Sequence, residues 1–108
     1  MSIIKNERLR KLRKSMMKIE IPALVVSNRI NRNYISGFTG TDCLLLITQE
    51  KALFVTDFRY TQQATKQVNG FDIFERPVNK STLQVAIESA LDLKVRKLGF
   101  ESAHLTYQ

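Results

Sequence analysis

Residues 43–47, an unbroken run of five apolar side chains, constrain the fold more than any other stretch of this chain. The run lacks the polar alternation of a strand with one solvent-facing side, and it is too short for a buried helix with its own caps. We therefore predict a central β-strand that is covered on both faces. A second apolar run, residues 52–55, follows after a polar connection of hairpin length, so the two runs are predicted to pair antiparallel.

The stretches on either side of this hairpin are predicted to extend and cover the sheet. Further strands are predicted at residues 23–26, 71–75 and 98–101, which together with the hairpin gives five strands. Asp57 is well placed to cap a helix that begins near Phe58, because its carboxylate can accept hydrogen bonds from the exposed amides of the first turn. Strand–helix–strand units in succession after a hairpin predict an α/β sandwich.

Two more helices are predicted from caps and periodicity. Ser27 or Asn28 can cap a short helix, which Gly37 ends. Ser81 begins a later helix in a capping-box pattern. The predicted inner stripe of that helix consists of Leu83, Ile87, Ala90 and Leu91.

The first twenty residues hold most of the positive charge. The formal net charge is +7, and residues 1–20 account for +5 of it. Apolar residues recur there at helical spacing, so we predict a helix that packs one apolar stripe on the sheet and leaves its basic residues in solvent. The predicted stripe consists of Leu9, Leu12, Met16 and Ile19. The alternatives are a phosphate-binding or nucleic-acid-binding face, a membrane-surface helix and an organelle presequence.

Length and composition predict one ordinary globular domain over residues 1–108. The chain is 44% hydrophobic and 25% charged, which lies within the globular range. Cys43 is the only cysteine, which excludes an intramolecular disulfide and favours a reducing, cytoplasmic setting. We expect Cys43 to be an unreactive, packed thiol inside the central strand. No apolar run approaches the ~18 residues needed to span a bilayer, so we expect no membrane partner.

The residues that catalysis needs are mostly missing. His104 is the only histidine, and we expect it to be a surface or helix-start residue. A hydrolytic metal site needs at least about three convergent ligands. The acidic residues are dispersed over separate elements, and no motif of a zinc peptidase, serine hydrolase or nucleotide-binding loop occurs. We therefore expect these 108 residues alone to be catalytically inactive.

The stretch from Asn33 to Tyr60 resembles a known family. YISGFTG followed by an apolar strand, a short break and ALFVTDFRYTQQA is similar to the amino-terminal domain of Xaa-Pro aminopeptidases and prolidases, the creatinase-related metallopeptidases. The resemblance runs from about Leu9 to the last residue. It implies a three-layer α/β/α sandwich with a five-stranded mixed sheet of ribonuclease-H-like type. The implied strand order is 3-2-1-4-5, with strand 2 antiparallel.

The resemblance also implies a division of labour in a longer protein. Residues 1–108 would be the non-catalytic amino-terminal domain, which takes part in subunit contacts of a homo-oligomer and in gating the active site. A carboxy-terminal catalytic domain would be its partner and would hold a dinuclear divalent metal centre of Mn, Co or Zn. Proline-containing peptides would be the substrates, and no nucleic-acid partner is implied.

Substrate-binding residues are implied in the same way. Arg59, in the TDxRY motif, is implied to bind substrate, with Phe38, Thr39 and Tyr60 as secondary candidates. A guanidinium can make two directed hydrogen bonds to a carboxylate or carbonyl, so the assignment makes chemical sense. The structural alternatives are an arginine paired with Asp57, a loop aromatic tucked under the sheet, and a helix tyrosine packed on the core.

Other functions stay open from the sequence. A creatinase-like amidinohydrolase begins with the same kind of domain, and a catalytically silent, peptidase-like binding module is a second alternative. Both share the fold implied above, so the motifs in these residues do not separate them from a peptidase.

Overall fold

The central strand of the sheet is β2, Cys43–Thr48, and every one of its residues is buried. The computed structural model describes residues 2–40 and 42–100, with side chains described from residue 7 onward. It has five strands in the order β4-β3-β2-β1-β5. The others are β1 (Ala23–Val26), β3 (Ala52–Thr56), β4 (Asp72–Glu75) and β5 (Leu98–Phe100). The sheet therefore has the predicted number of strands, with the most apolar one at its centre.

The strand directions agree with the prediction, but the order differs from 3-2-1-4-5. β2 is antiparallel to both β1 and β3, which confirms the hairpin and the reversed second strand. β4 pairs parallel with β3, not with β1, and β5 takes the free edge beside β1. The predicted position of β4 is wrong. The short helix α3 (Thr61–Gln67) connects β3 to β4 as a crossover, and it returns the chain to the position directly beside β3.

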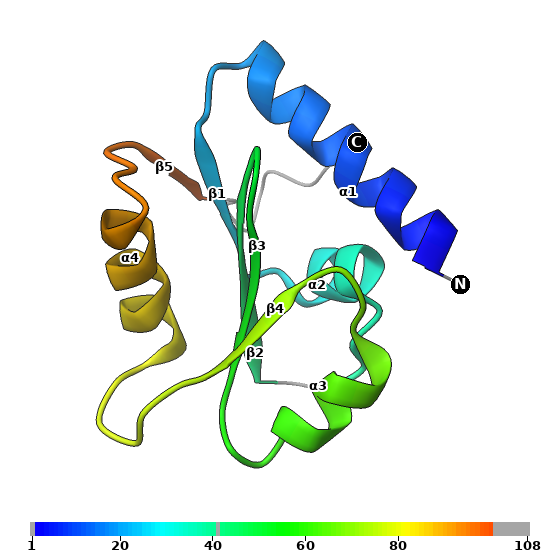
Figure 1. Cartoon of the computed structure of the whole chain (residues 1–108), viewed down its shortest axis with the longest axis vertical. Helices are drawn as coiled ribbons and strands as arrows, with labels where there is room; N and C mark the ends of the chain where they lie inside the picture. The colour runs from blue at the N-terminus through cyan, green and yellow to red at the C-terminus, as the bar shows by residue number, and fades with distance from the viewer. Residues whose placement is uncertain (1, 41, 101–108) are drawn as a thin grey trace.

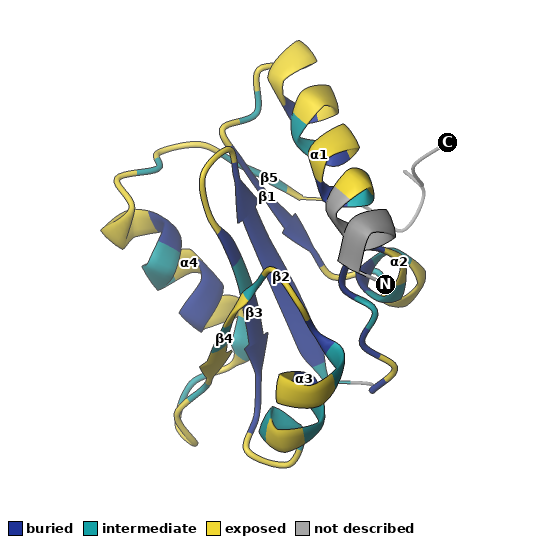
Figure 2. Ribbon diagram, turned by 45° about the vertical axis from the view of Figure 1, so that its right-hand side comes forward, coloured by how far each residue is buried: buried dark blue, intermediate teal, exposed yellow. Residues whose placement is uncertain are grey.

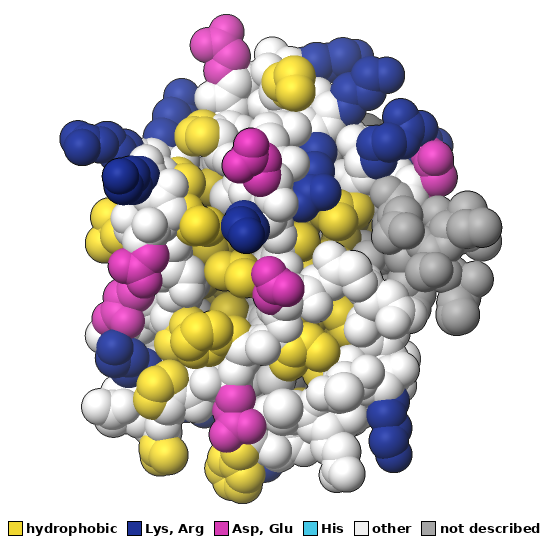
Figure 3. Space-filling view, viewed as in Figure 1, with side chains coloured by type: hydrophobic (Ala, Val, Ile, Leu, Met, Phe, Trp, Pro, Cys, Tyr) yellow, Lys and Arg dark blue, Asp and Glu magenta, His cyan; other side chains and the backbone are white. Residues whose placement is uncertain are grey.

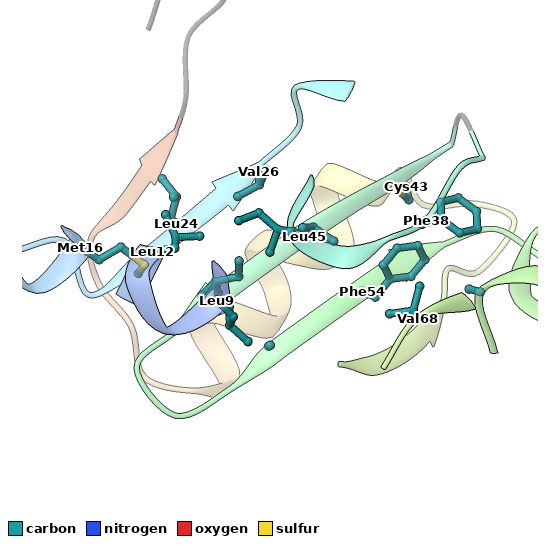
Figure 4. Close-up of a cluster of buried hydrophobic side chains, with 14 residues drawn as sticks. Leu9, Leu12, Met16, Leu24, Val26, Phe38, Cys43, Leu45, Phe54 and Val68 are labelled. Atoms are coloured by element: carbon teal, nitrogen blue, oxygen red, sulfur yellow. The ribbon is translucent and has the colours of Figure 1, made fainter. Parts of the chain in front are cut away.

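Helices cover both faces of the sheet and make three layers (Figure 1). α1 (Ser2–Lys18), α2 (Arg29–Ser36) and α3 lie on one face, and α4 (Thr82–Asp92) lies on the other. Figure 2 shows that β1, β2 and most of β3 are buried, and that the helices expose their outer sides. The outer strands β4 and β5 are partly or largely exposed. Side chains of α1, α2 and α3 form one core with the sheet, part of which Figure 4 shows, and α4 forms a second core with β1 and β2.

The first helix packs as predicted, apart from its last residue. Leu9, Leu12 and Met16 are buried against the sheet. Ile19 is 64% exposed because α1 ends at Lys18, so its place in the predicted stripe is wrong. Some of the basic residues of α1 bind backbone carbonyl oxygens: the Arg13 guanidinium donates to the Thr48 oxygen at 2.7 Å. None of the described helices is both long and apolar enough to cross a membrane.

The inner face of α4 differs from the prediction. Val85, Ala86 and Ala90 are its buried residues, so Ala90 is confirmed as part of the inner stripe. The other three predicted residues, Leu83, Ile87 and Leu91, are 42%, 37% and 65% exposed. The i, i+4 spacing drifts by roughly 40° per step around a helix, so the predicted stripe turns away from the sheet. Figure 3 shows hydrophobic side chains on the surface between α4 and β4. The fold therefore leaves apolar surface on this face.

The predicted ends of α2 and the predicted start of α4 are confirmed. Asn28 caps α2, since its side chain accepts from the backbone N–H groups of Ile30 and Asn31. Gly37 ends α2 with φ of 82°, in the left-handed region that favours glycine. Ser81 caps α4 by accepting from the Gln84 backbone N–H.

Candidate functional site

Charged side chains meet at the edge of the sheet where β3 and β4 end and β2 begins. Asp42 precedes β2, Asp57 follows β3, Arg59 lies two residues further on, and Arg76 follows β4. The start of β2 and the ends of β3 and β4 share one edge because β2 is antiparallel to β3 and β3 is parallel to β4. We refer to these four residues as the charge network.

Asp57 is the centre of the charge network. It is only 3% exposed. Its carboxylate accepts from Arg59 Nη2 at 2.6 Å and from the Arg59 backbone N–H at 2.9 Å. Arg76 Nη2 lies 3.7 Å from Asp57 Oδ2. The hydrogen bond from the Arg59 side chain is the main reason that the pKa of Asp57 lies well below its usual range.

Asp42 is the second carboxylate of the network, and its pKa shifts the other way. Arg59 Nη2 lies 3.2 Å from Asp42 Oδ2. The pKa of Asp42 is raised, first by a hydrogen bond with the Asp57 carboxyl group and then by partial burial. Of the two carboxyl groups, Asp57 is the one with the lowered pKa and stays ionised to lower pH.

The predicted role of Asp57 as a cap of the following helix is wrong. α3 begins at Thr61, and Tyr60 occupies its N-cap position without a side-chain capping bond. Asp57 lies before an additional turn at residues 58–60, and its carboxylate accepts from the backbone N–H within that turn. The Asp57 carboxylate therefore binds the backbone N–H and the guanidinium of Arg59. It does so because the turn brings these groups nearer to it than the first backbone amides of α3.

Arg59 is both exposed and fixed in position. Its side chain is 57% exposed, although Nε and Nη2 bind carboxylates. Its guanidinium carbon also lies 5.2 Å from the centre of the Tyr60 ring. None of the hydrogen bonds to the described residues uses Nη1, so this nitrogen has two N–H donors for a ligand. Phe58, beside it, is 71% exposed.

Two surface hollows share Arg76 in their lining. The first has a volume of about 390 Å³ and includes Asp57, Phe58 and Pro77 in its lining. The second has a volume of about 410 Å³ and includes Asp42 and Lys80. Residues of the charge network therefore line both surface hollows.

The structure places Phe38 in the core, and the site is built without it. Phe38 is fully buried, with edge-to-face contacts to Phe54 at 4.9 Å and to Tyr60 at 6.0 Å between ring centres. Figure 4 shows the first of these pairs. A Cβ atom at Gly40 would overlap the Phe38 ring, so the glycine allows this close approach. Phe38 thus has no surface with which to line a cleft.

Thr39 and Tyr60, the other secondary candidates, lie beside the network, and the Tyr60 ring faces the Arg59 guanidinium. Thr39 is exposed, and its backbone N–H donates to the Gln67 side chain on α3 at 3.1 Å. Tyr60 is half-buried and packs against the core at the start of α3. Thr39 therefore ties its loop to α3. His104 lies outside the described residues.

The described residues offer no metal site. Within residues 2–40 and 42–100, no group of three or more His, Cys, Asp or Glu side chains could hold a metal ion. The Asp42 and Asp57 carboxyl groups form the one close pair of the network, and Arg59 and Arg76 already neutralise them. A divalent metal needs several anionic ligands without competing cations, so this donor set does not fit one.

Cys43 is buried, and burial raises the pKa of its thiol to about 11. At pH 8 roughly one thiol in a thousand would be the reactive thiolate, against about a quarter of the molecules for an unperturbed thiol. We expect the folded protein to react with Ellman's reagent at least about 100-fold more slowly than the urea-unfolded chain. Absorbance at 412 nm measures both rates, with glutathione as the control thiol. Equal rates would show that Cys43 is accessible.

Sequence reasoning missed Asp42, Arg76 and Arg32. Arg76 could have been placed near Asp57 because it directly follows β4, which is parallel to β3. The carboxyl ends of adjacent parallel strands lie at the same end of the sheet. Asp42 could have been placed there too, because the start of β2 lies beside the end of β3 in the antiparallel hairpin. Arg32 is 7% exposed and donates from Nη1 to the Cys43 carbonyl at 2.6 Å. Its burial had no sequence signal, because arginine in a short polar helix is ordinarily exposed.

Comparison with known proteins gives consistent matches over nearly the whole chain. The sequence profile described as the creatinase/prolidase N-terminal domain matches residues 8–108. Among curated proteins, the uncharacterized peptidase YqhT of Bacillus subtilis is 38% identical over 100 residues, which cover 93% of this chain and 28% of that protein. The chain thus spans just over a quarter of the length of this relative.

Solved structures share the fold. The Xaa-Pro dipeptidase from Bacillus anthracis has a TM-score of 0.85 and 34% identity, over 95% of this chain and 28% of that one. The N-terminal domain of the cytoplasmic peptidase PepQ from Mycobacterium tuberculosis H37Rv has a TM-score of 0.82 and 30% identity, over 93% of this chain and 76% of that one. The first match covers a small part of a longer chain, and the second covers most of a separately crystallised domain.

Proposed function

The chain belongs to the family of creatinase/prolidase N-terminal domains, and we propose that it is the non-catalytic amino-terminal domain of a metal-dependent Xaa-Pro peptidase, either an aminopeptidase or a dipeptidase. Similarity to the Bacillus anthracis dipeptidase supports this proposal, since the chain matches 28% of that longer protein. In the proposed arrangement, a catalytic domain elsewhere in the polypeptide is the partner of this one.

A dinuclear Mn, Co or Zn centre in that catalytic domain would activate water and polarise the scissile carbonyl group. The proposed contribution of this domain is to bind and orient the substrate. We assign that role to the turn that holds Phe58 and Arg59, because it presents a cation and an aromatic ring together on the surface.

The observation that supports this role most directly is that the Arg59 side chain is exposed to solvent and is also held in place by two carboxylates. A surface arginine ordinarily samples many rotamers, and ordering it on binding costs free energy. Here Asp57 and Asp42 already hold Nε and Nη2, and the side chain is still 57% exposed. Arg59 Nη1 can then donate to a carbonyl or carboxylate oxygen of a proline-containing peptide with little further ordering.

Subunit contacts and gating are the second part of the proposal. Phe74 on β4 and Leu91 on α4 are 45% and 65% exposed, and such apolar surface is typical of contacts between protein chains. In the proposed homo-oligomer, a neighbouring subunit would cover this surface, and the Arg59 turn would lie at the rim of a peptidase active site. The domain would then restrict which peptides enter.

The substrate role of Arg59 is tested in the full-length protein. We expect Arg59→Ala to lower kcat/KM for Xaa-Pro peptides by about tenfold or more, since loss of a charged hydrogen bond costs about 1.5–3 kcal/mol. Hydrolysis is followed by release of the amino-terminal residue, and metal content is measured in parallel. Arg10→Ala is the matched control, because Arg10 is also an exposed, ion-paired arginine.

Three outcomes would contradict parts of the proposal. Equal kcat/KM for the Arg59→Ala and Arg10→Ala variants would remove Arg59 from the substrate site. Loss of metal in the Arg59→Ala variant would point to a general structural effect. A full-length protein that binds no divalent metal and hydrolyses no Xaa-Pro peptide would overturn the peptidase assignment itself.

A further inference from the structure

A groove lies between α1 and α2, on the face of the sheet opposite α4. The two helices pack against each other on that face (Figures 1 and 2). The groove has a volume of about 600 Å³, and residues of both helices line it. We refer to six of the lining residues as the α1–α2 groove: Arg8, Lys11 and Leu12 of α1, and Ile30, Tyr34 and Ile35 of α2. None of them belongs to the charge network.

The floor and one wall of the α1–α2 groove are apolar. Leu12 and Ile35 are buried and form the floor. Ile30 and Tyr34 are 77% and 54% exposed, and they are four residues apart on α2. Residues at this spacing lie on one side of a helix, so the two side chains form a continuous apolar strip. Exposed apolar surface beside polar residues is typical of a contact with another protein.

The wall contributed by α1 carries two cations, Arg8 and Lys11. Neither forms an ion pair with a described residue, and the lining of the groove includes no acidic side chain. Arg8 is held in place: its Nη1 donates to the Tyr34 carbonyl oxygen at 2.9 Å, and its guanidinium carbon lies 4.0 Å from the centre of the Tyr34 ring. The groove therefore combines an apolar strip with a positioned cation and a second, exposed cation.

This combination favours an acidic amphipathic helix over other anionic partners. A nucleic-acid backbone would satisfy the cations but would leave Ile30 without an apolar contact. An anionic membrane takes up the apolar face of a helix that projects into it, whereas Ile30 and Tyr34 line a hollow. A helix bound in a groove inserts apolar anchors at spacings of three and four residues, and carboxylates on the same face can reach the cations beside them.

We propose that the α1–α2 groove binds an acidic amphipathic helix of a partner protein. Apolar side chains of that helix would pack on Ile30 and Tyr34, and its carboxylates would accept hydrogen bonds from Arg8 and Lys11. These two cations are three residues apart, a rise of about 4.5 Å along α1. Two carboxylates three or four residues apart on the partner helix match that separation. This interaction does not depend on the proposed peptidase function.

The test is a selection on the 108-residue chain from a displayed library of helical peptides. The library varies the side chains on one face of a fixed helix, with acidic, basic, polar and apolar choices equally represented. We expect the enriched peptides to carry apolar and acidic residues together, at spacings of three and four. Fluorescence anisotropy then measures the Kd of an enriched peptide. The same peptide with glutamine for each glutamate should bind at least about tenfold more weakly.

Two substitutions at exposed residues test the charge and the apolar strip separately. Lys11→Glu and Ile30→Ser should each raise the Kd by about tenfold or more, because one reverses a charge that faces the ligand and the other removes an apolar contact. Lys66→Glu, on α3 outside the groove, makes the same change of charge and should alter the Kd less than about twofold. Thermal melts followed by circular dichroism establish that the variants fold as the parent does.

Several results would overturn the proposal. The absence of enrichment, or enriched peptides without acidic residues, would show that the groove does not select such a helix. Equal Kd values for the Lys11→Glu and Lys66→Glu variants would place the peptide elsewhere. Binding of poly(U) RNA or phosphatidylserine vesicles that Lys11→Glu weakens and Ile30→Ser does not would assign the cations to those anions.

Two further measurements separate a partner protein from occupants that the polypeptide itself supplies. An enriched peptide should bind the full-length protein as tightly as it binds the 108-residue chain. Loss of binding in the full-length protein would mean that another part of the polypeptide covers the groove. Light scattering should give the same mass for the parent chain and the Ile30→Ser variant. A dimer that Ile30→Ser dissociates would make a second copy of the chain the occupant. Either result would overturn the proposal.

Discussion

Replacing Phe38 by alanine is expected to lower the free energy of unfolding by about 3–5 kcal/mol, the usual cost of removing a buried aromatic ring. Phe38 is fully buried between α2 and β2, and its ring contacts those of Phe54 and Tyr60 edge-to-face. The loop can collapse little into the resulting cavity, since Gly40 packs directly on the ring. Aromatic pairs contribute roughly a further 0.5–1.5 kcal/mol beyond area burial.

Phe58→Ala is the matched control for this prediction. It removes the same side chain from a position that is 71% exposed, so its effect should stay within about 0.5 kcal/mol. Urea denaturation followed by circular dichroism gives both values. If the Phe38→Ala protein were as stable as the Phe58→Ala protein, Phe38 would not be a core residue. In that case, the substrate contact that the family resemblance implies for Phe38 would be tested by measuring kcat/KM of the Phe38→Ala variant.

The pair Phe38 and Phe58 shows why the sequence located the fold better than the site. Burial of the 43–47 strand could be predicted because a continuous apolar run has only one stable environment. An isolated aromatic in a loop has no such periodic context, so its burial depends on contacts between distant elements. The resemblance directed attention to Phe38, whereas the structure exposes Phe58 beside Arg59.

Charged residues were harder to place than apolar ones for a related reason. Arg59 could be named from its motif, but its partners Asp42 and Arg76 follow from strand order and register. The strand order implied by resemblance put β4 in the wrong position, away from β3. With that order, Arg76 would not have been expected near Asp57. The charge network is therefore a tertiary feature, assembled from three strand ends that are far apart in sequence.

Asp57→Asn is expected to cost about 2–3 kcal/mol of stability at pH 7. The substitution keeps the shape of the side chain but removes a buried charge that accepts hydrogen bonds from Arg59. Hydrogen bonds to charged groups contribute about 1.5–3 kcal/mol, and loss of one member of a buried ion pair costs more. Because Arg59 is half-solvated, we place the cost at the lower end of that combined range. Asp72→Asn, at an exposed carboxylate, is the control.

The pH dependence of this effect follows from the direction of the Asp57 shift. Its folded-state pKa lies below the ordinary aspartate value of about 4, so its stabilisation is complete above about pH 5 and is lost as the pH falls through the lowered pKa. Asp42 shifts the opposite way, and protonation of Asp42 relieves repulsion between the two carboxylates as the pH falls. The stability difference between the parent and the Asp57→Asn variant should therefore be fully present from pH 7 down to about pH 5 and should shrink on acidification below about pH 4. Urea titrations at pH 7, 5, 4 and 3 measure it. A difference that stayed constant over this range would mean that Asp57 is not held ionised by Arg59, and the preorganised arginine on which the proposed function depends would lose its support.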